Sequence, residues 1–104
     1  MAALFDTAHF DHMTGGDRAL QAEILSLFRA QVDGWSVAMN EGGWRAAVHT
    51  VKGSARGIGL MTLAETCEAA ERAQDTDAAA ALAQVRAALD QALAALDQFV
   101  ADAA

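Results

Sequence analysis

The residues of this chain whose types and spacing could do chemistry lie in one short stretch, HTVKGSARGIG, from His49 to Gly59. Lys52 follows the histidine by three positions and Gly53 follows it by four, so on a helix they lie one turn from it. A neutral imidazole is a nitrogen nucleophile near physiological pH. A neighbouring ammonium places positive charge where phosphoryl oxygens would sit. The stretch therefore indicates a phosphoryl acceptor, and no P-loop, glycine-rich nucleotide loop or metal cluster accompanies it as a donor site.

Gly53 is the least expected residue of the stretch, because glycine inside a helix costs about 1 kcal/mol relative to alanine. A helical wheel puts His49, Gly53 and Arg56 on an outward face, with Lys52 exposed at its flank. We interpret Gly53 as clearing room for a macromolecule to approach the imidazole ring. The opposite, core-facing side of the wheel carries Trp44, Val48, Val51, Ala55 and Ile58.

A hairpin between this helix and the next would bring acidic residues to the level of the histidine. If the turn is centred near Leu60, Glu71 lies level with His49 and at the edge of an apolar stripe, so its carboxylate could reach the imidazole. A carboxylate there would orient the ring and favour one tautomer. A solvated acidic face is the alternative interpretation. The other pairs expected at one level are Lys52 with Glu68, and Arg45 with Asp75.

Five helical segments are expected to position these residues, since the alternation of polar and apolar residues that marks strands is absent. Asp17 is a good N-cap for the second of them, and NEGG, residues 40–43, separates it from the third. We predict an all-α fold: an antiparallel up-down-up-down four-helix bundle with a short N-terminal helix, forming one domain over residues 1–104. The segments are residues 5–13, a long helix after Asp17, residues 44–58, a helix around 63–70 and a last helix after residue 77.

Apolar residues spaced by three and four mark the buried faces of the long helices. We expect Gly34 to weaken the second helix without ending it. The apolar stripe of that helix comprises Leu20, Ile24, Leu27, Phe28, Trp35, Ala38 and Met39, and that of the last helix comprises Leu82, Val85, Leu89, Ala92, Leu96 and Phe99. The core is predicted to include Leu27, Val48, Val51, Ala55, Cys67, Leu89 and Leu96.

The composition disfavours several classes of protein. Fourteen acidic residues against 7 basic ones give a net charge of −7, which repels phosphate backbones and anionic lipids. The one cysteine cannot form an intrachain disulfide, so a reducing compartment is expected. Nothing at the N-terminus resembles a signal peptide, and no window approaches the roughly 18 apolar residues of a membrane span. We expect a cytoplasmic protein.

The motif H-x-x-K-G-S-A-x-x-I-G, with AV before it and LAETCEAAE after it, resembles the histidine-containing phosphotransfer (HPt) domains of bacterial two-component phosphorelays. The leading FD, the segment GGDRALQAEILSLF and the last helix also fit, so the resemblance covers nearly the whole chain. It implies a four-helix bundle with an exposed phosphoacceptor. By position, His49 resembles the phosphorylated histidine, Lys52 the lysine that stabilises the phosphoryl group, and Gly53 the glycine that admits the partner.

The resemblance also implies the partners and the kind of reaction. Members of the family pass a phosphoryl group between aspartates of receiver domains, and those partners supply the aspartate and the Mg²⁺. We therefore expect a monomeric phosphoryl carrier without a cofactor, nucleotide site or autonomous kinase activity. Its partners would be receiver domains, a hybrid histidine kinase, or both. Arg45, Lys52 and Arg56 form a small basic patch that suits an acidic receiver surface better than nucleic acid.

Two positions depart from the family pattern. Glu71 stands where some members have a glutamine that hydrogen-bonds near the phosphoacceptor, and Gly57 replaces a residue that is often asparagine. The first departure leaves the role of Glu71 in phosphate contact open. The second is expected to fray the end of the helix and to leave the acceptor face intact.

Other interpretations carry less support. His9 and His12 share a helix face near Asp6 and Asp11, but no further ligand set is evident, so we expect no metal site. A helical adaptor that binds receivers or kinases without accepting phosphate is the alternative from another class. The dimerisation domain of a histidine kinase is disfavoured, because Thr50 follows the histidine where an acidic residue is usual, and the chain lacks proline.

Overall fold

The computed structural model describes residues 4–103, which form α-helices and one short 3-10 helix, with no strand in that range. None of these helices is long and apolar enough to cross a membrane. The domain expected over residues 1–104 thus includes residues 1–3 and 104, which lie outside the described range. The elements are α1 (Thr7–Thr14), α2 (Arg18–Ala38), α3 (Trp44–Ile58), α4 (Met61–Glu71), η1 (Asp75–Asp77) and α5 (Ala78–Ala103).

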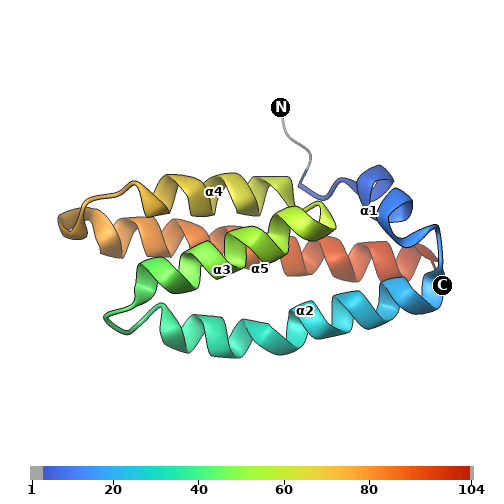
Figure 1. Cartoon of the computed structure of the whole chain (residues 1–104), viewed down its shortest axis with the longest axis horizontal. Helices are drawn as coiled ribbons and strands as arrows, with labels where there is room; N and C mark the ends of the chain where they lie inside the picture. The colour runs from blue at the N-terminus through green and yellow to red at the C-terminus, as the bar shows by residue number, and fades with distance from the viewer. Residues whose placement is uncertain (1–3, 104) are drawn as a thin grey trace.

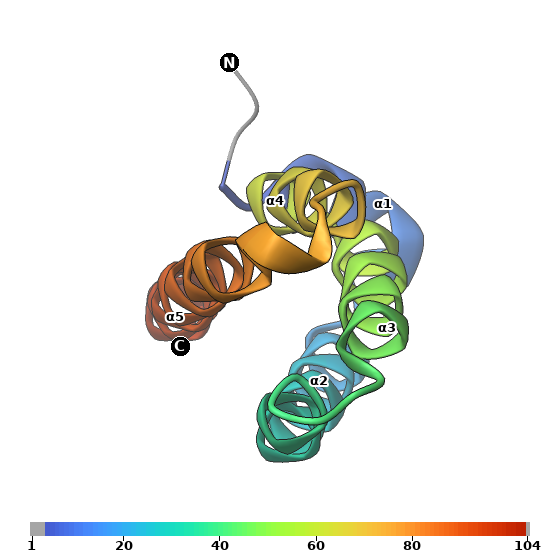
Figure 2. The same ribbon diagram turned by 90° about the vertical axis from the view of Figure 1, so that its left-hand side faces the viewer.

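Four of the helices lie lengthwise beside one another. Seen along the long axis, α3 lies between α2 and α4, and α4 lies between α3 and α5 (Figure 2). Helix α2 also contacts α5, so α2, α3, α4 and α5 enclose one interior. Helix α1 packs near one end of this set, against α2 and α3 (Figure 1). The all-helical fold and the order of the segments agree with the prediction.

The interior is built mainly on α3, whose core-facing stripe is as the wheel predicts. Val48, Val51 and Ala55 have no exposed surface, and Trp44 is half-buried at the start of the helix. Small and branched side chains allow α3 to approach its neighbours closely. The other helices contribute further buried residues to this interior. These are Leu63, Cys67 and Ala70 of α4, and Val85, Leu89, Ala92 and Leu96 of α5.

The predicted core face of α2 is partly wrong. The Leu27 side chain is 58% exposed and that of Leu20 is 40% exposed. Phe28, Trp35 and Met39 of the predicted stripe are buried, whereas near the start of α2 the buried residues are Gln21 and Leu25, one position beyond the predicted Leu20 and Ile24. At that end of the helix a glutamine faces inward. Burial is possible for that glutamine because it is hydrogen-bonded.

Gln21 joins α2 to α1. Its amide nitrogen donates at 2.8 Å to Asp11 Oδ1 and at 2.8 Å to Thr14 Oγ1, while its amide oxygen accepts from Arg18 at 2.7 Å. Thr14 is itself buried and donates to the Phe10 carbonyl at 2.8 Å. A buried polar side chain with all these partners satisfied orients the corner between the two helices.

Helix α3 ends at a glycine that the fold requires. Gly59 has φ +95°, and its amide donates to the Ala55 carbonyl at 3.0 Å. Its own carbonyl accepts from the Asp6 amide at 2.8 Å, and His9 Nε2 donates to the Gly57 carbonyl at 3.3 Å. These bonds hold α1 against the last turn of α3. Gly57 does not fray the helix, which continues to Ile58.

Gly59→Ala is expected to lower the free energy of unfolding by about 2 kcal/mol or more. An L side chain in the left-handed region costs about 1–2 kcal/mol, and its Cβ would lie 2.8 Å from the Asp6 carbonyl oxygen. Gly57→Ala is the matched control, because a Cβ there meets nothing within 4 Å. It is expected to raise stability by up to about 1 kcal/mol. Urea unfolding of both variants measures the difference, and equal stabilities would contradict it.

Candidate functional site

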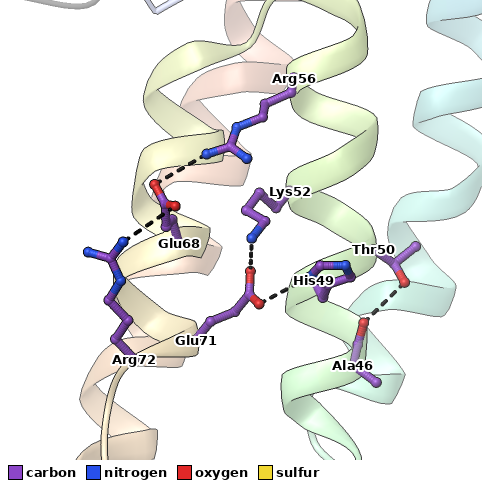
Figure 3. A network of polar contacts seen from close by, with 8 residues as sticks. All are labelled: Ala46, His49, Thr50, Lys52, Arg56, Glu68, Glu71 and Arg72. Carbon is purple, nitrogen blue, oxygen red and sulfur yellow. Dashed lines mark hydrogen bonds and ion pairs between the residues drawn. The ribbon is translucent and has the colours of Figure 1, made fainter.

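His49 projects from the middle of α3 into solvent, with 69% of its side chain exposed. Gly53 lies one turn further on, is exposed, and has nothing within 4 Å of the position a Cβ would take. The neighbouring Thr50 hydroxyl donates to the Ala46 carbonyl of its own helix at 3.0 Å and so leaves the ring free (Figure 3). The structure thus places the histidine and the glycine on the outward face, as the wheel predicts.

Glu71, in the last turn of α4, reaches the histidine across the helix pair. Its Oε2 lies 3.0 Å from His49 Nδ1 (Figure 3). The Lys52 ammonium chiefly, and His49 in addition, lower the pKa of Glu71 below its ordinary value, although partial burial opposes this. The carboxylate is therefore ionised at neutral pH and can only accept hydrogen bonds. Nδ1 must then carry the ring proton.

The tautomer fixed by Glu71 leaves the other ring nitrogen of His49 with its lone pair. Among residues 4–103, no side chain or backbone group hydrogen-bonds to His49 Nε2. An unprotonated, exposed imidazole nitrogen is a nucleophile. The atom that can accept an electrophile is thereby specified as Nε2.

Lys52 is less exposed than the wheel predicts. Only 15% of its side chain is accessible, because α4 covers this flank of α3. Its ammonium lies 2.7 Å from Glu71 Oε1, not beside Glu68 as the hairpin register suggested. The contact is an ion pair with the buried Oε1. One carboxylate therefore engages both the lysine and the histidine.

The two arginines of the expected basic patch are exposed but already paired. Arg45 lies 2.6 Å from Asp75, as the register predicts, and its guanidinium stacks 4.3 Å from the centre of the Trp44 ring. Arg56 lies 3.2 Å from Glu68, which also pairs with Arg72 at 3.5 Å (Figure 3). Exposed pairs of this kind contribute little stability and exchange partners readily.

An apolar flank of α2 adjoins the acceptor face, and the sequence analysis missed it. Helical spacing puts Leu20, Leu27 and Ala38 on one side of α2. Ala38 lines an open hollow together with Ala46 and Thr50 of α3, so this side of α2 lies next to the face that carries His49. The signal was present in Leu20 and Leu27, which the apolar spacing assigned to the core, whereas Ile24 does pack against the core.

Cys67 lies under the site without entering it. It has no exposed surface, and burial first, with the nearby Glu71 charge second, raises the pKa of its thiol to about 11. The protonated thiol is a weak nucleophile. The prediction that Cys67 packs in the core is confirmed.

Comparison with known proteins agrees with this geometry. The family model described as the Hpt domain matches residues 21–99. The chain belongs to this family of histidine-containing phosphotransfer domains. The search of curated proteins finds no significant match.

A solved structure gives a more particular likeness. The chain is similar to the histidine phosphotransferase ShpA from Caulobacter crescentus, with a TM-score of 0.78 and 36% sequence identity. The alignment covers 96% of this chain and 93% of ShpA. The resemblance read from the motif is thereby confirmed, and the chain has a histidine phosphotransfer role in a two-component phosphorelay. Receiver domains and kinases are the general partners of such domains.

Proposed function

We propose that His49 is the phosphoacceptor and that it relays a phosphoryl group between receiver-domain aspartates through a phosphohistidine at Nε2. The observation that carries the proposal is the contact of Glu71 with Nδ1, which leaves an exposed Nε2 with a free lone pair. Gly53 is proposed to admit the partner, and Lys52 to compensate the charge of the phosphoryl group.

The proposed reaction is an in-line displacement at phosphorus. The Nε2 lone pair forms the N–P bond, the bond from phosphorus to the receiver's aspartate oxygen breaks, and the aspartate leaves as a carboxylate. The ring keeps its Nδ1 proton and becomes positively charged, and Glu71 faces that charge at 3.0 Å. The reverse reaction returns the phosphoryl group to a receiver. The chain itself needs no cofactor in this scheme, and the Mg²⁺ belongs to the receiver.

The proposed docking surface combines the acceptor face of α3 with the apolar flank of α2. Leu20 and Leu27 offer exposed apolar contact beside the His49 face. Arg45 and Arg56 are proposed to meet acidic groups of the receiver at the edge of this surface. They would do so by exchanging their present carboxylate partners, Asp75 and Glu68.

The proposal includes the architecture and setting of the carrier. Helices α2 to α5 are assigned an antiparallel up-down-up-down order, with α1 as a short leading helix. The brief connections between them, 39–43, 59–60 and 72–77, support this order. We propose one domain that acts as a cytoplasmic monomer and as a phosphoryl carrier, without a nucleotide site of its own.

The test of this function is transfer of label from a phosphorylated receiver domain to the protein. Acid-labile, base-stable phosphate on the protein is expected, and it identifies phosphohistidine. Binding of the receiver without any transfer of label would instead identify a helical adaptor. Incubation with ATP alone is expected to give no label.

Lys52→Ala is expected to slow phosphoryl transfer from a receiver by about tenfold or more, because one charged contact to the phosphoryl group is lost. It should also cost about 1–2 kcal/mol of stability, since it leaves the buried Oε1 of Glu71 without a cation. Arg72→Ala removes an exposed cation from the neighbouring helix and should change neither quantity appreciably. Single-turnover transfer and urea unfolding measure both effects, and an unchanged transfer rate in Lys52→Ala would contradict the role.

A further inference from the structure

One carboxylate in the site has two partners that a phosphoryl group would disturb differently. Glu71 Oε1 lies 2.7 Å from Lys52 Nζ, and Oε2 lies 3.0 Å from His49 Nδ1 (Figure 3). A phosphoryl group on Nε2 would add negative charge on the far side of the ring from Glu71. It would therefore compete with Glu71 for the lysine while leaving the Nδ1 contact in place.

The lysine is held in a way that permits such an exchange. Its contact with Oε1 is a single ion pair at 2.7 Å, and lysine has a flexible stem with a freely oriented ammonium. When the ammonium moves to the phosphoryl oxygens, Oε1 loses the cation beside it. Only 23% of the Glu71 side chain is exposed, so solvent compensates for this loss only in part. A buried charge left without its partner raises the free energy of the state that contains it, here the phosphorylated state.

The contact with the ring promotes loss of the phosphoryl group in a second way, through the quality of the leaving group. The N–P bond breaks with its electron pair returning to Nε2 as the phosphoryl group passes to an acceptor oxygen. With the proton on Nδ1, the ring leaves as neutral imidazole; without that proton it would leave as imidazolate, a far poorer leaving group. An ionised carboxylate 3.0 Å from Nδ1 keeps the proton there. The phosphohistidine is thereby held in its labile form.

We infer that Glu71 is a positioning residue that keeps the phosphohistidine labile, by taking Lys52 in the resting state and by holding the Nδ1 proton in the phosphorylated state. This inference rests on the proposed role of His49. A glutamine at position 71 could still accept the Nδ1 hydrogen bond through its amide oxygen, but it would bring no charge to either contact. The carboxylate makes the chain a carrier that gives up its phosphoryl group readily.

The other charged groups near His49 are already paired or lie at the edge of the site. Arg56 and Arg72 share Glu68, and the Cys67 thiol is buried and protonated. The α2 flank beside α3 is apolar. The acidic residue on that side, Glu41, lines the hollow that also contains Thr50. On the N-terminal side of His49, Arg45 pairs with Asp75 of η1. Lys52 and Glu71 are thus the charges that can respond directly to the state of the ring.

The test compares the wild-type protein with Glu71→Gln and with Glu68→Gln, each phosphorylated by phosphoramidate. Glu68→Gln is the matched control, because Glu68 lies on the same helix and pairs with cations but does not contact the histidine. Loss of the phosphohistidine is followed by ³¹P NMR as a function of pH, after circular dichroism has checked that each variant is folded.

Glu71→Gln is expected to keep its phosphohistidine about fivefold longer than the wild type at neutral pH. That factor is the difference between a charge-assisted and a neutral hydrogen bond. The pH profile of the loss should move to lower pH, a change that a purely structural role would not produce. In a Lys52→Ala background the gain should shrink. Glu68→Gln should follow the wild type.

Coincident lifetimes and pH profiles for Glu71→Gln and the wild type would overturn the inference while leaving the proposed function intact. A shorter lifetime in Glu71→Gln would also overturn it, and an undiminished gain in the Lys52→Ala background would overturn the exchange of partners by the lysine. Failure of the wild-type protein to take up phosphate would overturn the proposed function, and the inference with it.

Discussion

His49→Gln is expected to remain folded and to take up no phosphate from either a receiver domain or phosphoramidate. The side chain is 69% exposed and contacts the rest of the bundle through Glu71, so its replacement should change the free energy of unfolding by less than about 1 kcal/mol. The amide of glutamine is not a nucleophile comparable to Nε2 of a neutral imidazole. Loss of the label with an unchanged helical spectrum therefore identifies the acceptor.

His9→Gln and His12→Gln are the matched controls, because both histidines are also exposed. Both variants should be labelled as the wild type is. His9→Gln also removes the bond to the Gly57 carbonyl, so a small loss of stability without loss of label is expected. Normal labelling of His49→Gln, or loss of label in either control, would contradict the assignment.

The acceptor helix could be predicted from the sequence because its two faces differ sharply. Apolar residues at 48, 51, 55 and 58 leave one choice of inward direction, and the polar residues then have to face outward. The contact between His49 and Glu71 could also be predicted from the sequence. A turn of two residues, 59–60, joins α3 to α4, and such a short connection limits the register of the pair.

The inward face of α2 could not be predicted in the same way. In its first turns, Leu20 and Leu27 are exposed while the neighbouring Gln21 is buried, so here a glutamine faces inward beside exposed leucines. Hydrophobicity alone favours Leu20 over Gln21 for the core, because it assigns no value to the hydrogen bonds that Gln21 makes with α1. Those partners come from another helix and are defined only once the chain has folded.

The exposure and the partner of Lys52 could not be predicted from the sequence for a related reason. A wheel describes one helix, whereas the exposure of a residue at its flank depends on how closely the next helix approaches. Here α4 covers the flank, so the lysine is largely buried and meets Glu71 instead of Glu68. Long side chains reach across about one turn, so level alone does not choose between two carboxylates on the same face.

Gly53→Gln is expected to separate two kinds of phosphodonor. A Cβ at this position meets nothing within 4 Å, so the isolated bundle should fold as before, and phosphoramidate should label it at close to the wild-type rate. The glutamine side chain would, however, stand one turn from His49 in the space that a receiver must enter. A displacement of about 1 Å at a reacting centre can cost about a hundredfold in rate. Transfer from a phosphorylated receiver should fall by that order.

Gly53→Ala distinguishes the size of the side chain from the loss of the glycine. Alanine is a better helix former and should stabilise the bundle by up to about 1 kcal/mol, while its single methyl group leaves most of the approach open. It should therefore accept phosphate from the receiver at nearly the wild-type rate. If Gly53→Gln lost activity equally with both donors, the glycine would shape the histidine itself and not the docking surface. If neither donor were affected, no partner would approach over this face of α3, and the docking surface assigned beside His49 would be wrong.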